Sequence, residues 1–199
     1  YKDAFIGREY NIVEGRCGLH QQNNAITDFF DEGISVVRCD DDIQAIHLAL
    51  DKKTHQPVED LDALIKEGFS KCKEFGYSLW GVNGAWNPYF CGKGINKNLC
   101  FLIGTFCGII NDKSILSTTE EKEDTERCIL HYIKRGGLVK MKSYMVKQKY
   151  ITEEGGIQSN IKEEDRKKRS YEVAKQLEKR FPKTGKAIIR KSNGWGEYR

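Results

Sequence analysis

A cysteine with a glycine on either side lies within the stretch Glu14-Gly15-Arg16-Cys17-Gly18-Leu19-His20-Gln21-Gln22-Asn23-Asn24. This stretch leads into a predicted helix over residues 17–30, in which Leu19, Asn23, Ile26 and Phe30 recur on one side. Cys17, His20 and Asn24 lie on another side of the same helix. Unlike the other six cysteines, Cys17 is set in polar sequence, which suits a nucleophile better than a packing residue.

Helical and strand-like segments alternate after this helix. The apolar run at 43–50 predicts a strand buried on both faces, after a strand at 34–39. Apolar residues at helical spacing predict a helix over 58–75, closed by a left-handed cap at Gly76. Later elements are expected at 77–90 (two short strands), 100–110 (one or two buried strands), 117–136 (a helix with a capping box at Ser117, Thr118 and Thr119), 138–151 (a basic strand), 155–156 (a turn), 161–181 (a helix) and 187–189 (a strand). Such interleaving predicts a single α+β domain.

Charge divides the chain into two parts. The whole chain has a net charge of +4, but residues 1–130 carry 14 basic and 21 acidic side chains, and residues 131–199 carry 19 and 8. This −7/+11 asymmetry suggests a nucleic acid, a membrane surface or another acidic partner for the basic part, or docking between two copies. We expect an acidic α+β core at 1–137 and a basic strand-helix-strand extension at 138–199, packed on the same domain.

The residues around Cys17 suit a thiolate nucleophile. Backbone N–H groups at the start of a helix stabilise a negatively charged sulfur. Gly15 and Gly18 allow a sharp entry of the backbone and a close approach of a substrate, and Arg16 adds a positive charge. The pattern predicts a cysteine-dependent hydrolase in which Cys17 attacks a carbonyl carbon and the helix N–H groups stabilise the oxyanion.

The same residues carry a resemblance. Cys17-x-x-His20-x-x-Asn23-Asn24, preceded by Glu14-Gly15, resembles the helix-opening motif of Josephin-type cysteine proteases. It is more loosely similar to the corresponding segment of viral papain-like and ovarian-tumour-type proteases. The resemblance covers about 11 of the 199 residues. It implies a papain-like fold, a ubiquitin-directed or polyprotein-directed peptidase or isopeptidase, a nucleophile at Cys17, and supporting positions for His20 and Asn24.

A cysteine nucleophile needs a base within hydrogen-bond reach, and the chain has four histidines. His47 is the preferred base, because it lies in the middle of the predicted strand 43–50 and cysteine hydrolases place their base on a central strand. His131, on the predicted acid-rich helix, is the second choice. His20 is a direct alternative, one helical turn from Cys17.

The basic part is a second candidate site. Lys140, Lys142, Lys147 and Lys149 surround Tyr144, and cations neutralise phosphates while aromatic rings stack on unpaired bases. These residues support an alternative function, a nucleic-acid- or polyanion-binding module or a small metal-independent nuclease that combines a histidine with Glu9 or an arginine. The mixed charges of 161–181 are equally typical of a solvated helix face.

A third alternative is a catalytically inactive relative that serves as an interaction protein, because residues 77–110 contain no histidine. Seven cysteines, most in apolar surroundings, and the absence of an Asn-x-Ser/Thr site favour a cytoplasmic location over secretion after removal of a signal peptide. Cys17-x-x-His20 has no second half-site, so we expect no zinc and no other cofactor. The longest apolar run, 99–110, is too short to cross a membrane.

Overall fold

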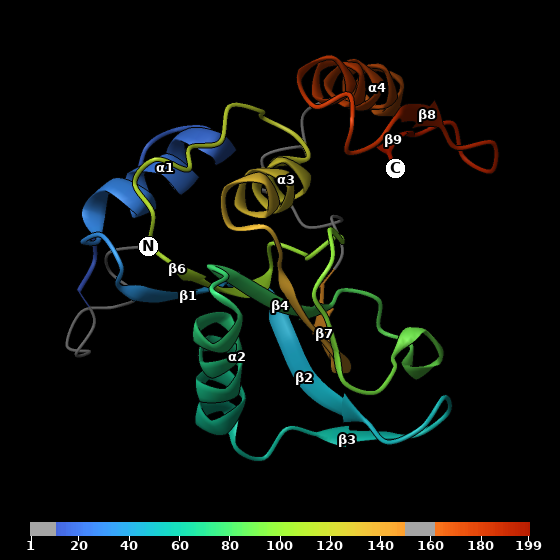
Figure 1. Ribbon diagram of the computed structural model, residues 1–199. Coiled ribbons are helices and arrows are strands. Elements are labelled where there is room, and N and C mark those ends of the chain that lie inside the picture. Colours follow the sequence, from blue (N-terminus) through green and yellow to red (C-terminus); the bar gives the residue numbers. More distant parts are fainter. Residues whose placement is uncertain (1–10, 150–161) are drawn as a thin grey trace.

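The computed structural model describes residues 11–149 and 162–199 (Figure 1). Its main element is a seven-stranded sheet in which β4 and β7 are parallel and all other neighbours are antiparallel. The order across the sheet is β1 (Ser35–Cys39), β6 (Phe106–Ile110), β4 (Leu79–Asn83), β7 (Val139–Gln148), β2 (Ile43–Ala49) and β3 (His55–Pro57), and the short β5 (Ile95–Asn96) pairs with β7.

Helices cover both faces of this sheet (Figure 1). α2 (Leu61–Phe75) packs on one face, and α1 (Leu19–Phe29) and α3 (Glu123–Arg135) lie over the other. The chain ends with α4 (Glu163–Arg180) and a separate hairpin of β8 (Ala187–Ile189) and β9 (Gly196–Tyr198). The α+β prediction is therefore confirmed.

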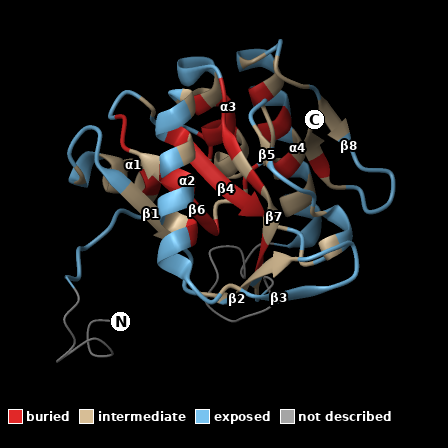
Figure 2. Cartoon of the chain, turned by 60° about the horizontal axis from the view of Figure 1, so that its bottom comes forward, coloured by how far each residue is buried: buried red, intermediate tan, exposed pale blue. Residues whose placement is uncertain are grey.

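The alternation of side chains along β4 separates the two layers of the core. Trp80 and Val82 pack toward Phe69 of α2, while Leu79 packs toward Cys128 of α3. All five residues of β4 are buried, as expected for a central strand with helices on both sides (Figure 2).

The indole of Trp80 fixes the distance between α2 and the sheet. It makes edge-to-face contacts with Phe69 and Phe106, at centroid distances of 5.7 and 5.6 Å. A Cβ atom at Gly68 would lie 2.4 Å from the indole, and one at Gly108 would lie 2.0 Å from its Nε1 atom. Glycine is needed at both positions because the indole occupies the space of any side chain.

Several elements match the sequence predictions, among them the short strand β8 at 187–189, and others do not. α2 ends at Gly76, which has a φ of +73°, and β2 and α4 lie within a few residues of their predicted bounds. The expected second strand within 77–90 is instead the 3₁₀ helix η2 (Pro88–Phe90), and residues 100–105 are irregular. The short strands β3, β5 and β9 have no counterpart among the predictions.

The predicted capping box at Ser117, Thr118 and Thr119 is wrong. α3 begins only at Glu123, and its N-cap residue, Lys122, makes no side-chain cap. Thr118 and Thr119 instead donate their N–H and hydroxyl groups to the buried carboxylate of Glu126, at 2.8 to 3.0 Å. The buried carboxylate captures these donors because it would otherwise lack partners.

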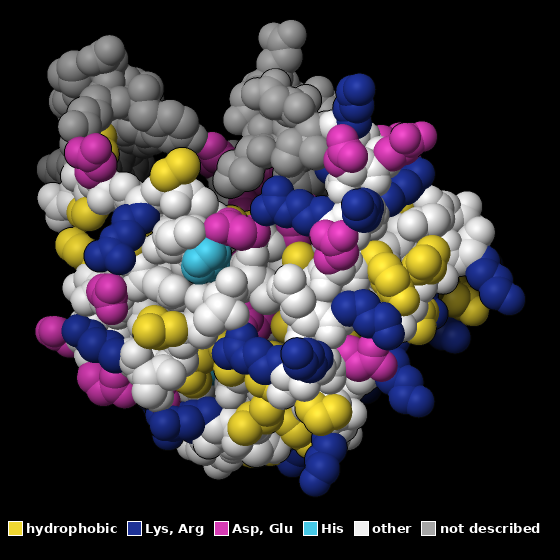
Figure 3. Space-filling view, turned by 90° about the horizontal axis from the view of Figure 1, so that it is seen from above, with side chains coloured by type: hydrophobic (Ala, Val, Ile, Leu, Met, Phe, Trp, Pro, Cys, Tyr) yellow, Lys and Arg dark blue, Asp and Glu magenta, His cyan; other side chains and the backbone are white. Residues whose placement is uncertain are grey.

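The basic part contributes both to the sheet and to a peripheral unit. β7, from the basic part, is a central strand between β4 and β2. The unit of α4, β8 and β9 contacts the segment before and within α3 through charged side chains. Figure 3 shows that one face of the molecule carries both basic and acidic side chains. The predicted turn at 155–156 lies outside the described residues. Among the described helices, each is too short or too polar to span a membrane.

Candidate functional site

Cys17 lies on the surface just before α1. Its thiol is free and the residue is exposed. Gly18, the N-cap of α1, has a φ of +100°, which side chains other than glycine rarely tolerate. Three residues after Cys17, Nδ1 of His20 lies 2.9 Å from Oε1 of Glu120. A carboxylate in that position can orient an imidazole ring.

α1 is fixed to the segment before α3 along its whole length. Nε2 of Gln21 donates to the same Glu120 oxygen at 3.0 Å. The amide of Asn24 donates to O of Ser117 and accepts from its N–H, both at 2.9 Å. At the other end, the side chain of Asn111 donates to three carbonyl groups at the C-terminus of α1. Asn24 therefore supports the position of the helix that follows Cys17.

The structure does not bring His47 to Cys17. α1, which follows Cys17, lines a pocket together with β1 and β6. His47 is on β2, which is three strands away from β6, roughly 14 Å at the usual strand spacing. Nδ1 of His47 lies 2.7 Å from Nδ1 of His55, and its ring packs edge-on against Trp86. Burial, His55 and Lys147 lower the pKa of His47.

His131, the second-choice base, lies inside the protein. It comes from α3, is buried, and its Nδ1 pairs with the hydroxyl of Ser78 at 2.7 Å. Burial and the nearby charge of Arg127 lower the pKa of His131 to about 3. The ring is therefore neutral at physiological pH, and it lines a pocket rather than the surface near Cys17.

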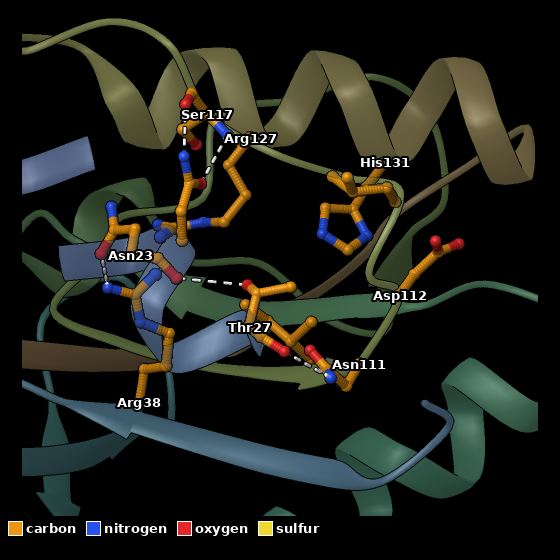
Figure 4. Close-up of a pocket in the computed structure, with 11 residues that line it drawn as sticks. Asn23, Thr27, Arg38, Asn111, Asp112, Ser117, Arg127 and His131 are labelled. Carbon is orange, nitrogen blue, oxygen red and sulfur yellow. Dashed lines mark hydrogen bonds between the residues drawn. The ribbon is translucent and has the colours of Figure 1, made fainter. Parts of the chain in front are cut away.

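That pocket lies between α1, β1, β6 and α3, and two arginines reach into it (Figure 4). The cavity is small, about 20 Å³, which is roughly the space that one water molecule needs. Arg127 extends from α3 and Arg38 from β1 toward Asn23 of α1, and Arg38 donates to the amide oxygen of Asn23. The sequence predictions missed both arginines. Arg38 could have been noticed as the one charged residue among the mostly apolar residues 34–39. Arg127 could have been noticed because it lies one helical turn before His131.

The lysines of β7 do not form one cluster with Tyr144. Tyr144 packs with the α2 layer of the core. Lys140 donates to the carbonyl of Phe101, and Lys142 lies against Gly92. Lys147 lies over the ring of Trp86 at 5.8 Å. Lys149 follows the strand and bonds through its backbone to Asp42. Glu9 lies outside the described residues.

Aromatic residues within 86–90 lie near two lysines, Lys147 and Lys52. Tyr89 and Phe90 of η2 are 60% and 65% exposed, and Lys52 lies over the ring of Tyr89 at 5.2 Å. We call the residues Lys52, Trp86, Tyr89, Phe90 and Lys147 the aromatic–lysine surface. Trp86 contacts His55 of β3 and lies under Lys147 of β7, and η2 begins two residues after Trp86.

The seven cysteines are free thiols, and three of them, Cys72, Cys107 and Cys128, are buried. Burial raises the pKa of Cys72 and of Cys128 to about 12. Within 11–149 and 162–199, no group of three or more histidine, cysteine, aspartate or glutamate residues is arranged to hold a metal ion. Comparisons with protein-family models, with curated proteins and with solved structures find no match to this chain.

Proposed function

We propose that the chain is a cysteine hydrolase of peptide or isopeptide bonds, with Cys17 as nucleophile and His20 as general base. The observation that carries the proposal is the 2.9 Å contact between His20 and Glu120 beside an exposed cysteine. His20 replaces His47 as the preferred base because it is near Cys17 in the chain and has an orienting carboxylate. The domain then has a papain-like arrangement, in which the nucleophile precedes a helix that packs on a sheet.

The contact with Glu120 suggests roles for the two ring nitrogens. Nδ1 of His20 faces Glu120, and in this proposal the proton is on Nδ1, so Nε2 carries a lone pair and accepts the proton of the Cys17 thiol. The sulfur attacks the carbonyl carbon, and the C=O electron pair moves onto the oxygen. Backbone N–H groups of the first turn of α1, which has no side-chain cap, donate to this oxyanion.

Collapse of the tetrahedral intermediate breaks the C–N bond, and the amine leaves with the proton from His20. A water molecule then attacks the thioester, His20 takes its proton, and the proton returns to the departing Cys17 sulfur. Seven free thiols are in keeping with a reducing compartment, so a cytoplasmic location goes with this proposal.

Alkylation by iodoacetamide, followed residue by residue with mass spectrometry, tests the nucleophile. Cys39 is an internal control, because it is also exposed and burial of its sulfur, with Cys107 and Asp40, raises its pKa. We expect Cys17 to react at least about tenfold faster than Cys39 at pH 7. His20→Gln and Glu120→Gln should slow Cys17 and leave Cys39 unchanged. Equal rates for the two cysteines would contradict the proposal.

The substrate class needs a second assay. A ubiquitin whose C-terminus carries an electrophile should form a covalent adduct with the wild-type protein and none with Cys17→Ser. A reactive Cys17 that forms no such adduct would leave the hydrolase proposal intact but exclude ubiquitin as the substrate suggested by the resemblance.

The second candidate function is binding of single-stranded nucleic acid at the aromatic–lysine surface. Exposed rings beside lysines combine base stacking with phosphate neutralisation. Tyr89→Ala should weaken binding of a fluorescent oligonucleotide by about tenfold. Lys134→Gln, at an exposed position on α3, is the control and should have little effect. Absence of binding at low salt, or binding that salt does not weaken, would remove this candidate.

A further inference from the structure

The guanidinium group of Arg127 is buried without hydrogen-bond acceptors. The residue is 5% exposed, and Nε, Nη1 and Nη2 each have no hydrogen-bond partner among residues 11–149 and 162–199. A guanidinium carries five N–H donors, and burying them unpaired costs free energy. The pocket that Arg127 lines therefore contains donors that the described protein does not satisfy.

Further donors point into the same space. Arg38 reaches the pocket from β1, and burial, followed by repulsion from Arg127, lowers its pKa. The guanidinium of Arg38 donates to the amide oxygen of Asn23, which is buried. The amide nitrogen of Asn23 takes no part in this hydrogen bond. The amide nitrogen itself has no partner in the described structure. The two guanidinium groups and this amide nitrogen thus bring hydrogen-bond donors to one cavity (Figure 4).

The nearby carboxyl groups do not supply the missing acceptors. Glu123 and Asp124, at the start of α3, interact electrostatically with Arg127, but neither accepts a hydrogen bond from its unpaired nitrogens. Burial, with the charge of Asp124, raises the pKa of Glu123 to about 7, so its negative charge is partial at neutral pH. Asp112 also lines the pocket, but its oxygens already accept from Ser114 and Arg135.

We propose that this pocket binds one oxyanion group, a carboxylate or a phosphate, through the guanidinium groups of Arg38 and Arg127 and the amide nitrogen of Asn23. Guanidinium forks match the paired oxygens of either group. The cavity is small, so in this proposal the rest of a larger ligand lies outside it. None of the contacts that support this site rests on Cys17 or on the proposed hydrolase.

Thermal unfolding of the whole chain tests the site. Sodium acetate and sodium phosphate are compared separately with sodium chloride at equal ionic strength. At about ten times its Kd, the preferred anion should raise Tm by about 3–6 °C, in a saturable manner. Acetate acting alone identifies a carboxylate site, and phosphate acting alone identifies a phosphate site. Titration calorimetry on the wild-type protein gives the Kd without any substitution.

Variants locate the binding. Arg127→Met and Arg38→Met should each abolish the anion-dependent rise in Tm, while Lys134→Met removes an exposed positive charge from α3 and should keep it. If the methionine variants fold poorly, Arg127→Lys keeps the charge but loses the fork and should raise Kd at least about tenfold. Two outcomes overturn the proposal: a wild-type Tm that is the same in acetate, phosphate and chloride, as for a pocket that holds water alone, or a rise that persists in both methionine variants.

Discussion

His131 is a histidine that the fold keeps uncharged. Burial and the neighbouring Arg127 lower its pKa to about 3, whereas an unfolded histidine titrates near 6.5. Between these values the unfolded chain binds a proton that the folded chain does not. The free energy of unfolding therefore falls as the pH falls, by about 1.4 kcal/mol per pH unit for this group. The contribution of neutral His131 is fully present above pH 6.5 and is lost progressively toward about pH 3.

Replacing His131 by glutamine should remove this pH dependence. Glutamine keeps a polar partner for Ser78 but cannot be protonated. In urea titrations from pH 7.5 to 4, the difference in unfolding free energy between wild type and His131→Gln should shrink steadily below pH 6.5. Nuclear magnetic resonance of the ring protons offers a direct check, and a His131 ring that titrates near pH 6.5 in the folded protein would contradict the assignment.

At the scale of single elements, the sequence predicts those that carry their own pattern. α2 has apolar periodicity over 15 residues and a glycine cap, so its existence follows from local sequence. β3 and β5 have three and two residues and exist only because β2 and β7 offer them a pairing edge. In the candidate site around Cys17, too, only part of the residues could be predicted from local sequence. Cys17 and His20 share one motif, but Glu120 is 100 positions from His20, and only the folded chain brings it there.

The N-terminal cap of α2 is an element-scale feature that can be measured. Oδ1 of Asp60 accepts a hydrogen bond from the N–H of Ala63 at 2.8 Å. Asp60→Ala should lower the free energy of unfolding by about 1 kcal/mol, because an N–H group of the first turn then loses its acceptor. Asp62→Ala removes a negative charge two residues later, in the first turn of α2, without removing a cap, so chemical denaturation should show a smaller loss for it. If the two variants lose the same unfolding free energy, the effect of Asp60 comes from its charge near the helix N-terminus and not from the cap.

At the scale of the whole molecule, opposite charges meet within one chain. Val173, Ala174 and Leu177 of α4 are buried, and α4 packs against β8 and β9 of its own unit. The contacts of this unit with the rest of the protein include Arg180 with Glu126, Arg169 with Glu121, and Lys122 with the carbonyl of Gly196. Basic side chains from the positively charged part of the chain thus pair with acidic side chains before and within α3, and these pairs help to hold the C-terminal unit in place.

These ion pairs should differ in strength because their surroundings differ. Glu126 is fully buried, and although burial alone would raise its pKa, the donors of Thr118 and Thr119 hold that pKa below its usual value. Arg180→Met leaves this charge without its cation and should destabilise the docking of α4 by about 1–3 kcal/mol.

Arg169→Met removes a partly exposed partner of Glu121 at 3.5 Å and should cost less than about 0.5 kcal/mol. Hydrogen exchange measures both effects, because undocking exposes amides of α4, β8 and β9 while those of β4 and β7 stay protected. Raising the sodium chloride concentration should speed exchange in the C-terminal unit of the wild type, since salt screens exposed charges. If both variants exchange like the wild type, apolar contacts rather than charge hold the unit in place.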